Sequence, residues 1–185
     1  ANRIAVFDPI TDTMVEYTVP SRNTSWADCE GIEYCGISQV FGFTVDDKKI
    51  WFTEWVENNI GVVDTSIPLP FTIDTDTENI VLERRQSISV TFDINPTKDF
   101  RTDVAKGVSD SWYPNVSTTS LFNDLSITSD AHNSWGLDTD QKLGHDSITV
   151  WIAASDNALP GTHKVLFGAY NDEIAISKFI TVTIE

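Results

Sequence analysis

Apolar and polar residues alternate along most of this chain with a period of two. This alternation is typical of β-strands that bury one face. It is clearest over residues 88–94, 148–152 and 180–184, where every second residue is Ile, Val or Phe. No segment keeps a 3.6-residue apolar period for long enough to indicate a helix. The pattern therefore predicts an all-β fold.

Short turn sequences rich in Asp, Asn, Pro and Gly separate the apolar runs. These residues set or tolerate the backbone angles that tight turns need. We predict strands at residues 3–7, 14–19, 39–45, 50–55, 60–63, 71–73, 80–82, 87–94, 125–128, 147–153, 162–170 and 174–184. Residues 99–120 are either an inserted loop or a region with irregular strands.

The sequence Ser-Ile-Pro-Leu-Pro at residues 66–70 interrupts this pattern. Proline cannot donate to a sheet ladder, and two prolines so close together favour an extended linker. We therefore predict one domain at residues 1–70 and a second at residues 71–185. Strand signals in the second domain recur at the spacing of a β-sandwich.

The first domain contains an internal repeat. The phrase Asn-x-Ile-x-Val-x-Asp occurs at residues 2–8 and again at residues 58–64. Repeats of a few tens of residues indicate propellers or solenoids, in which a single unit cannot bury its own apolar face. Residues 1–70 have room for little more than one such unit.

Residues 2–20 and 50–64 resemble the streptogramin lyase-like (virginiamycin B lyase-like) β-propellers. The resemblance lies in Ile-Trp-Phe-Thr-Glu-Trp followed by Asn-x-Ile-Gly-x-x-Asp, and in Asn-Arg-Ile-Ala-Val-Phe-Asp-Pro. It implies a partial propeller-like blade sheet, with the cysteine-containing loop as an insertion. Catalysis in that family implies a histidine acting with glutamates and magnesium. Glu54 matches the glutamate of the phrase, but residues 1–70 contain no histidine, so we do not expect the lyase activity.

Residues 81–92 and 160–184 resemble immunoglobulin-like modules appended to prokaryotic surface proteins. The resemblance rests on Val-Leu-Glu-Arg-Arg-Gln-Ser-Ile-Ser-Val-Thr-Phe, on Pro-Gly-Thr-His-Lys-Val and on Ser-Lys-Phe-Ile-Thr-Val-Thr-Ile. It implies an immunoglobulin-like β-sandwich over residues 71–185. This resemblance implies a fold but does not indicate a ligand.

The chain is acidic, with a net charge of −16. The charge is spread over both predicted domains, since residues 1–70 carry 4 basic and 11 acidic residues, and the rest carry 8 and 17. A uniformly negative chain repels phosphate backbones, so we predict no nucleic-acid partner. No apolar run approaches the roughly 20 residues that span a bilayer. Peripheral association with a membrane complex remains open.

Two features indicate an oxidising compartment. Cys29 and Cys35 flank a short segment that contains a glycine, which favours a small disulfide-closed loop over two unrelated thiols. No further Cys or His lies nearby, so a zinc site is poorly supported. The triplets that begin at Asn23 and Asn115 fit glycosylation acceptors, although such triplets also arise by chance. Together with a first residue, Ala1, that is typical of a processed product, they predict an extracellular or cell-surface location.

The residues with metal-binding or catalytic chemistry form no recognised motif. His132 and His145 bracket an acidic stretch, with spacings that favour a solvated loop over a metal site. Its carboxylates are Asp130, Asp138, Asp140 and Asp146. His163 lies in a strand pattern and is interpreted as a surface residue. There is no Gly-x-Ser-x-Gly motif, so we predict no catalytic residue, metal or cofactor.

The six tryptophans divide by position. Trp26, Trp112 and Trp135 lie in predicted loops, where they either stack on a ligand such as a sugar or pack under the loop; they are the ligand-binding candidates. The others lie in predicted strands and are expected in the core; they are Trp51, Trp55 and Trp151.

The sequence thus predicts a non-enzymatic extracellular or cell-surface module for binding or assembly, part of a larger exported protein or complex. A lone blade leaves strand edges unpaired, which soluble proteins normally cover. Either further blades of the same precursor or another protein chain would complete it. One alternative is the C-terminal portion of a propeller lyase-like enzyme, or a divergent hydrolase. Another is an accessory subunit on the outer face of a membrane complex.

Overall fold

The computed structural model describes residues 3–21, 36, 38–55, 57–97, 115–120, 124–129, 146–170 and 173–185. These residues form β-strands, turns and irregular segments without a helix, so the predicted all-β class is confirmed. The strands are β1 (Arg3–Asp8), β2 (Thr13–Thr18), β3 (Val40–Asp46), β4 (Lys49–Glu54), β5 (Asn59–Asp64), β6 (Phe71–Thr75), β7 (Asn79–Leu82), β8 (Ser87–Pro96), β9 (Asn115–Ser120), β10 (Leu125–Ser129), β11 (Asp146–Ala154), β12 (Gly161–Tyr170) and β13 (Ile174–Ile184).

The chain divides into two compact units. The first contains Ala1–Val6 and Glu16–Leu69, and the second contains Phe7–Val15 and Pro70–Glu185. The β1–β2 hairpin therefore contributes to both, because its turn end belongs to the second unit and its open end to the first.

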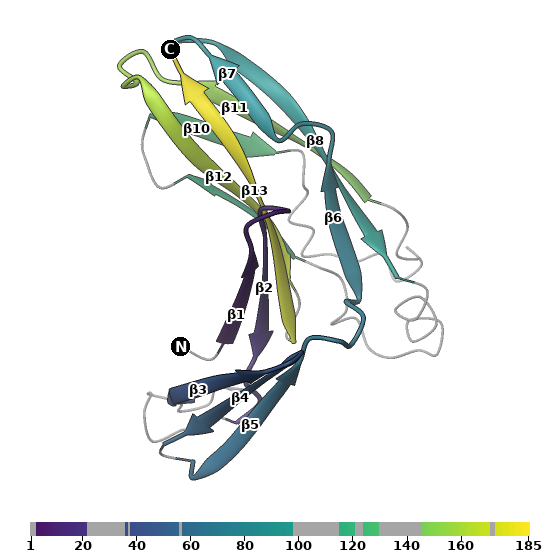
Figure 1. Ribbon diagram of the computed structural model, residues 1–185. Coiled ribbons are helices and arrows are strands. Elements are labelled where there is room, and N and C mark those ends of the chain that lie inside the picture. Colours follow the sequence, from purple (N-terminus) through teal and green to yellow (C-terminus); the bar gives the residue numbers. More distant parts are fainter. Residues whose placement is uncertain are drawn as a thin grey trace. The chain divides into compact units, whose positions relative to one another are not determined.

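Two sheets form a sandwich in the second unit (Figure 1). One has the strand order β10-β11-β8-β6, and the other contains β9, β12 and β13. Apart from Ile88, which is exposed, the alternating apolar residues that the sequence singled out are buried between the sheets. Phe92 of one sheet and Phe167 of the other are fully buried, and their rings stack with centroids 4.1 Å apart. This contact holds the two layers together at the centre of the core.

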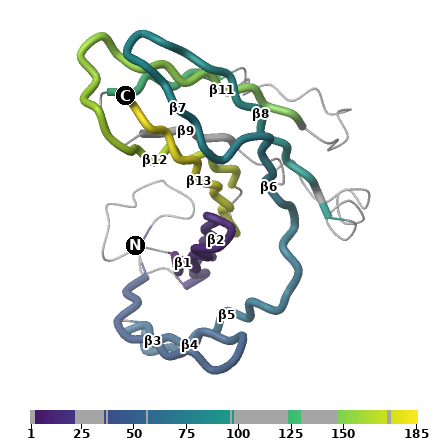
Figure 2. Tube along the Cα trace, turned by 45° about the horizontal axis from the view of Figure 1, so that its top comes forward, coloured from purple at the N-terminus to yellow at the C-terminus, as the bar shows by residue number. Residues whose placement is uncertain are grey.

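The strand order is that of a constant-type immunoglobulin sandwich. In that fold the first, second, fifth and fourth strands form one sheet, and the third, sixth and seventh form the other. Here β6, β8, β11 and β10 form the first sheet, and β9, β12 and β13 the second. The first strand is split: β6 pairs antiparallel with β8, whereas β7 pairs parallel with β13. Figure 2 follows the Cα trace from β6 into β7.

Two separate segments cover the outer edge of β13. β7 pairs with residues 181–184, and the turn of the β1–β2 hairpin lies against the preceding residues, where the Phe179 amide donates to the Asp12 carbonyl at 2.9 Å. Lys178 lies where these segments meet. Its Nζ donates to the Thr11 carbonyl at 2.6 Å and pairs with Glu78 Oε1 at 2.8 Å. The edge is therefore closed to other chains.

An antiparallel three-stranded sheet, in the order β3-β4-β5, forms the main part of the first unit. Asp47 and Asn58 occupy its two tight turns with φ values of 53° and 54°, in the left-handed region that Asp and Asn tolerate best among non-glycine residues. β3 carries a register shift between Val40 and Gly42, whereas β5 pairs regularly with β4. Among the described residues the sheet is open and closes into neither a barrel nor a propeller.

The structure resolves one alternative that the sequence left open. Part of residues 99–120 forms a strand, β9, which pairs antiparallel with β12 from Asn115 to Ser120. The preceding residues, 98–114, lie outside the described part of the chain.

Candidate interaction surface

The three-stranded sheet exposes many apolar side chains. Phe43 of β3 is 75% exposed, and Ile60 of β5 is 74% exposed. We call this set the apolar surface; it consists of Phe41, Phe43, Val45, Trp51, Trp55, Ile60 and Val62. They lie on both faces of the sheet, because Phe43 is opposite Phe52 in the ladder whereas Ile60 is opposite the next residue, Thr53. Single exposed apolar residues are ordinary, but so many on one small sheet indicate a binding region.

The β4–β5 hairpin owes its shape to a pair of residues in the phrase at residues 50–64. Phe52 and Gly61 lie directly opposite each other in the ladder, and Phe52 is only 4% exposed. A Cβ atom added at Gly61 would meet three atoms of the Phe52 ring at 2.7 Å or less. The ring therefore lies over the backbone of Gly61, in the space that any other residue would fill. This contact explains why Phe and Gly occur together in the phrase.

Glu54 is a buried structural carboxylate. It is 3% exposed, and it lies opposite Asn59 in the same ladder. Ser38 Oγ donates to Glu54 Oε1 at 3.1 Å, and Asn59 Nδ2 donates to Glu54 Oε2 at 3.2 Å. Both carboxylate oxygens therefore have partners, as burial of the group requires. The cluster ties the segment before β3 to the β4–β5 turn.

The aspartate that ends each copy of the phrase caps a turn. Asp8 accepts hydrogen bonds from the Ile10 amide at 2.9 Å and from Thr11 Oγ1 at 3.0 Å. Asp64 accepts from Oγ and the amide of Ser66, at 2.5 and 3.0 Å. These bonds favour the charged form, so the Ile10 amide chiefly lowers the pKa of Asp8, and the Ser66 hydroxyl chiefly lowers that of Asp64. The final aspartate of each copy of the repeat therefore has a structural role, because it fixes the turn that follows the strand.

An open groove of about 740 Å³ lies within the first unit, between the start of β1 and β3. Its lining is mainly apolar and comprises Arg3, Ile4, Ala5, Val6, Ser38, Gln39, Val40, Phe41, Phe43, Val45 and Ile50. Arg3 is the charged residue of this lining, and its guanidinium pairs with Glu16 at 3.4 Å. The groove extends the apolar surface beside β3, and the hydroxyl of its lining residue Ser38 donates to the buried Glu54 carboxylate.

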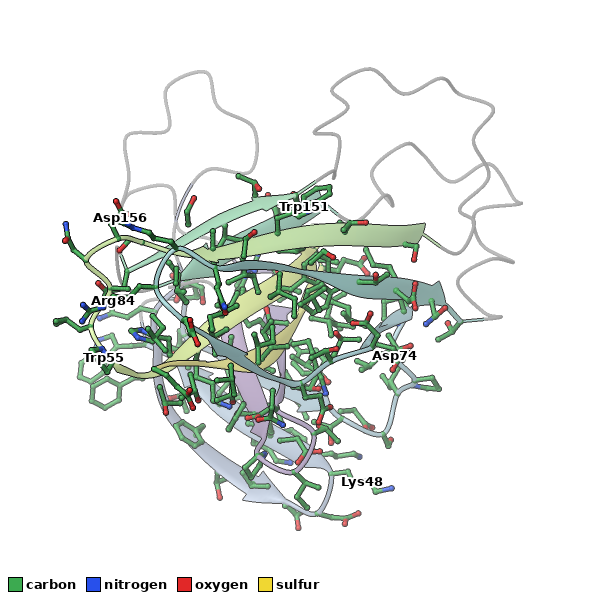
Figure 3. The ribbon with its side chains drawn as sticks, turned by 90° about the horizontal axis from the view of Figure 1, so that it is seen from above. Lys48, Trp55, Asp74, Arg84, Trp151 and Asp156 are labelled. Carbon is green, nitrogen blue, oxygen red and sulfur yellow. The ribbon has the colours of Figure 1, made fainter. Side chains whose placement is uncertain are left out.

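Three tryptophans expected in the core are exposed instead. Trp51 is 40% exposed, Trp55 67% and Trp151 43%. Trp55 contacts Phe41 edge to face, with ring centroids 5.0 Å apart. The Trp55 and Trp151 side chains project away from the ribbon in Figure 3. The core prediction is wrong because a strand has two faces, and its sequence alone does not tell which face is buried.

The interpretation of His163 as a surface residue is also wrong. It is 8% exposed and pairs with Val182 in the β12–β13 ladder, on the inward face of its strand.

Most of the other sites predicted from the sequence lie outside the described residues. These are Cys29, Cys35, Asn23, Trp26, Trp112, Trp135, His132 and His145. The disulfide, the first glycosylation site and the tryptophan ligand sites therefore stay predictions. Asn115 is the first residue of β9.

Metal-binding groups and membrane-spanning helices can be assessed for the part of the chain that the structure describes. No group of three or more His, Cys, Asp or Glu side chains is placed there to hold a metal ion. No helix there is long and apolar enough to cross a membrane.

Comparison with known proteins adds no relative. Neither a protein-family model nor a curated protein sequence matches the chain. The likeness of residues 2–20 and 50–64 to streptogramin lyase-like propellers therefore remains a resemblance between short sequence segments.

Proposed function

We propose that this chain is a non-enzymatic extracellular or cell-surface module that assembles with other polypeptide chains through its three-stranded sheet. The observation that carries the proposal is the apolar surface, in which Phe43 and Ile60 are each about three-quarters exposed. Leaving such side chains in water has a cost of roughly 25 cal/mol for each Å² that a partner could cover. Exposed apolar side chains gathered on one small sheet indicate a protein interface.

The chemistry of the first unit supports assembly over catalysis. Its buried carboxylate, Glu54, is held by Ser38 and Asn59, and its turn carboxylate, Asp64, caps the turn after β5, as Asp8 of the second unit does after β1. The hydrogen bonds of these carboxylates give each of them a structural role. The acidic chain, with a net charge of −16, favours a basic partner, whether in a free complex or on the outer face of a membrane assembly.

Binding of a hydrophobic dye to the full chain tests the proposal, with light scattering to check that the chain stays monomeric. The natural chain should bind the dye, and the double substitution Phe43→Ser and Ile60→Ser should reduce dye binding. Leu159→Ser is the matched control, because Leu159 is 67% exposed but lies in the sandwich unit. A natural chain that binds no dye would refute the proposal.

A further inference from the structure

The chain takes a different course after each copy of the repeated phrase. The first copy includes β1, and after the turn at residues 9–12 the chain returns as β2, which pairs with β1. So short a connection makes the pair antiparallel. The second copy includes β5, but the chain then continues through Thr65, Ser66 and the two prolines, and forms no strand before β6. Among the strands that the structure describes, β5 therefore lacks the outer neighbour that β1 has.

The hydrogen-bond pattern shows which groups of β5 this leaves open. The Thr65 amide donates to the Lys48 carbonyl at 2.8 Å, and hydrogen-bonded pairs recur at every second position of an antiparallel ladder. Phe52–Gly61 is therefore a hydrogen-bonded pair, and the pairs on either side of it are not. It follows that the N–H and C=O groups of Ile60 and Val62 point away from β4, toward the outer edge.

Among the described residues, this edge has little of the usual protection. β5 contains no Pro, Lys or Arg and has no bulge, and its charged residue, Asp64, is the last of the strand. Val62 is 47% exposed, so an incoming strand would meet apolar side chains as well as backbone groups. By contrast, β3 on the opposite edge is bulged at Val40/Gly42, and the edge of β13 is covered. Within the described residues, β5 is thus a regular edge strand that can accept a partner.

We propose that the outer edge of β5 binds an extended basic segment of another protein as an antiparallel fourth strand. The proposal rests on the assembly function above and names the partner of that surface. The orientation follows from β1 and β2, since the incoming strand would occupy the place that β2 takes beside β1. Main-chain hydrogen bonds to Ile60 and Val62 would supply affinity, and side chains on alternate positions would supply specificity.

Charge favours a basic partner over a second copy of this chain. Residues 1–70 carry 4 basic and 11 acidic residues, so two copies joined at β5 would bring two acidic units together. A segment rich in Lys or Arg would instead be attracted by the negative charge of this unit.

The test uses a synthetic peptide and amide exchange on the full chain. The peptide has the sequence of residues 13–19, with Lys at the position of Glu16 and two lysines added at its N-terminus. In the chain alone, the amide protons of Ile60 and Val62 should exchange fast. Saturating peptide should slow them by about tenfold or more. An acidic control peptide, with Glu16 kept and two glutamates added, should bind at least about tenfold more weakly.

A variant links any binding to the backbone of β5. Val62→Pro removes an N–H group that points outward, and proline is tolerated at such edge positions. It should weaken peptide binding by about tenfold, equivalent to roughly 1.4 kcal/mol, whereas the conservative Val62→Thr should stay within about threefold. Circular dichroism checks that both variants fold. The amide exchange of the natural chain remains a test should Val62→Pro fail to fold.

The outcomes separate this proposal from the assembly function. Dye binding without protection of the Ile60 and Val62 amides at about 1 mM peptide would refute strand addition and leave assembly standing. Protection of these amides without dye binding would support strand addition and refute the apolar interface. Protection that grows with chain concentration in the absence of peptide would mean that a second copy pairs with β5, and would overturn the basic partner.

Discussion

Replacing Gly61 by alanine should destabilise the β4–β5 hairpin by about 1–2 kcal/mol. The new methyl group would lie within 2.7 Å of three atoms of the Phe52 ring, which real Cβ atoms essentially never approach so closely. Because Phe52 is 4% exposed, its ring cannot move aside without losing burial. Overpacking of this kind costs about 1–3 kcal/mol. The lower chain entropy of alanine in the unfolded state offsets about 0.4–1 kcal/mol of that.

The assay is urea unfolding followed by the amide NMR signals of β4 and β5, so that the sheet is observed directly. A loss of 1–2 kcal/mol lowers the midpoint by about 1–2 M for a unit with a slope near 1 kcal/mol/M. Gly42→Ala is the matched control, since a Cβ there would lie 3.8 Å from Thr53 Oγ1 in ordinary contact. It should change stability by less than about 0.5 kcal/mol.

A double-mutant cycle isolates the contact between the two residues. The three ring atoms that a Cβ at Gly61 would meet are Cζ, Cε2 and Cε1 of Phe52, and leucine has none of them. Gly61→Ala should therefore cost little in a Phe52→Leu background, with a coupling energy of about 1 kcal/mol or more. If Gly61→Ala left the midpoint unchanged in the natural chain, or cost the same in both backgrounds, the role given to this pair would be wrong.

Three further predictions concern the charged groups. Lys178→Met should destabilise the sandwich by about 1–3 kcal/mol in urea unfolding, because it removes a buried ammonium that joins two edge segments. Glu78→Gln should cost under about 1 kcal/mol, because the Glu78 side chain is 62% exposed. Equal losses of stability for the two substitutions would contradict this explanation. Glu54→Ala should cost about 1–3 kcal/mol and speed amide exchange of the β4–β5 turn, and unchanged exchange would count against its structural role. Asp8 and Asp64 have folded pKa values below 3.8, so the stability they contribute is present above that pH and is lost as pH falls through the lowered values; an NMR titration that placed either pKa above 3.8 would reverse the argument.

The strands of this fold could be predicted from the sequence because their alternation is strong. The apolar positions of residues 174–184 predict a strand, and these residues form β13 over Ile174–Ile184. β9 is not predictable as a defined strand because Asn-Val-Ser-Thr-Thr-Ser is mostly polar. Its strand form comes from pairing with β12, a contact between distant segments that no local pattern reveals.

The faces of strands and the partners of charged residues were not predictable in the same way. Trp51 and Phe52 are neighbours in a strand, so their side chains point to opposite faces of the sheet. Because both are aromatic, the sequence does not tell which of the two is buried. Lys178 reads as a surface residue, yet it is 8% exposed because the hairpin turn lies against it. The carbonyl that it binds, at Thr11, is 167 positions away in the sequence. Such burial depends on tertiary contacts alone.

The edges of β13 and β5 differ in how far the described chain covers them. At β13, the chain uses both β7 and the β1–β2 hairpin turn to cover one edge, and it places a buried lysine where they meet. At β5, the same chain leaves a regular strand with Ile60 and Val62 exposed. An edge of this kind normally invites self-association, but the net charge of −16 opposes the approach of like chains. The same charge attracts a basic segment, so the β5 edge of this acidic chain disfavours pairing with its own copies and favours a partner of opposite sign.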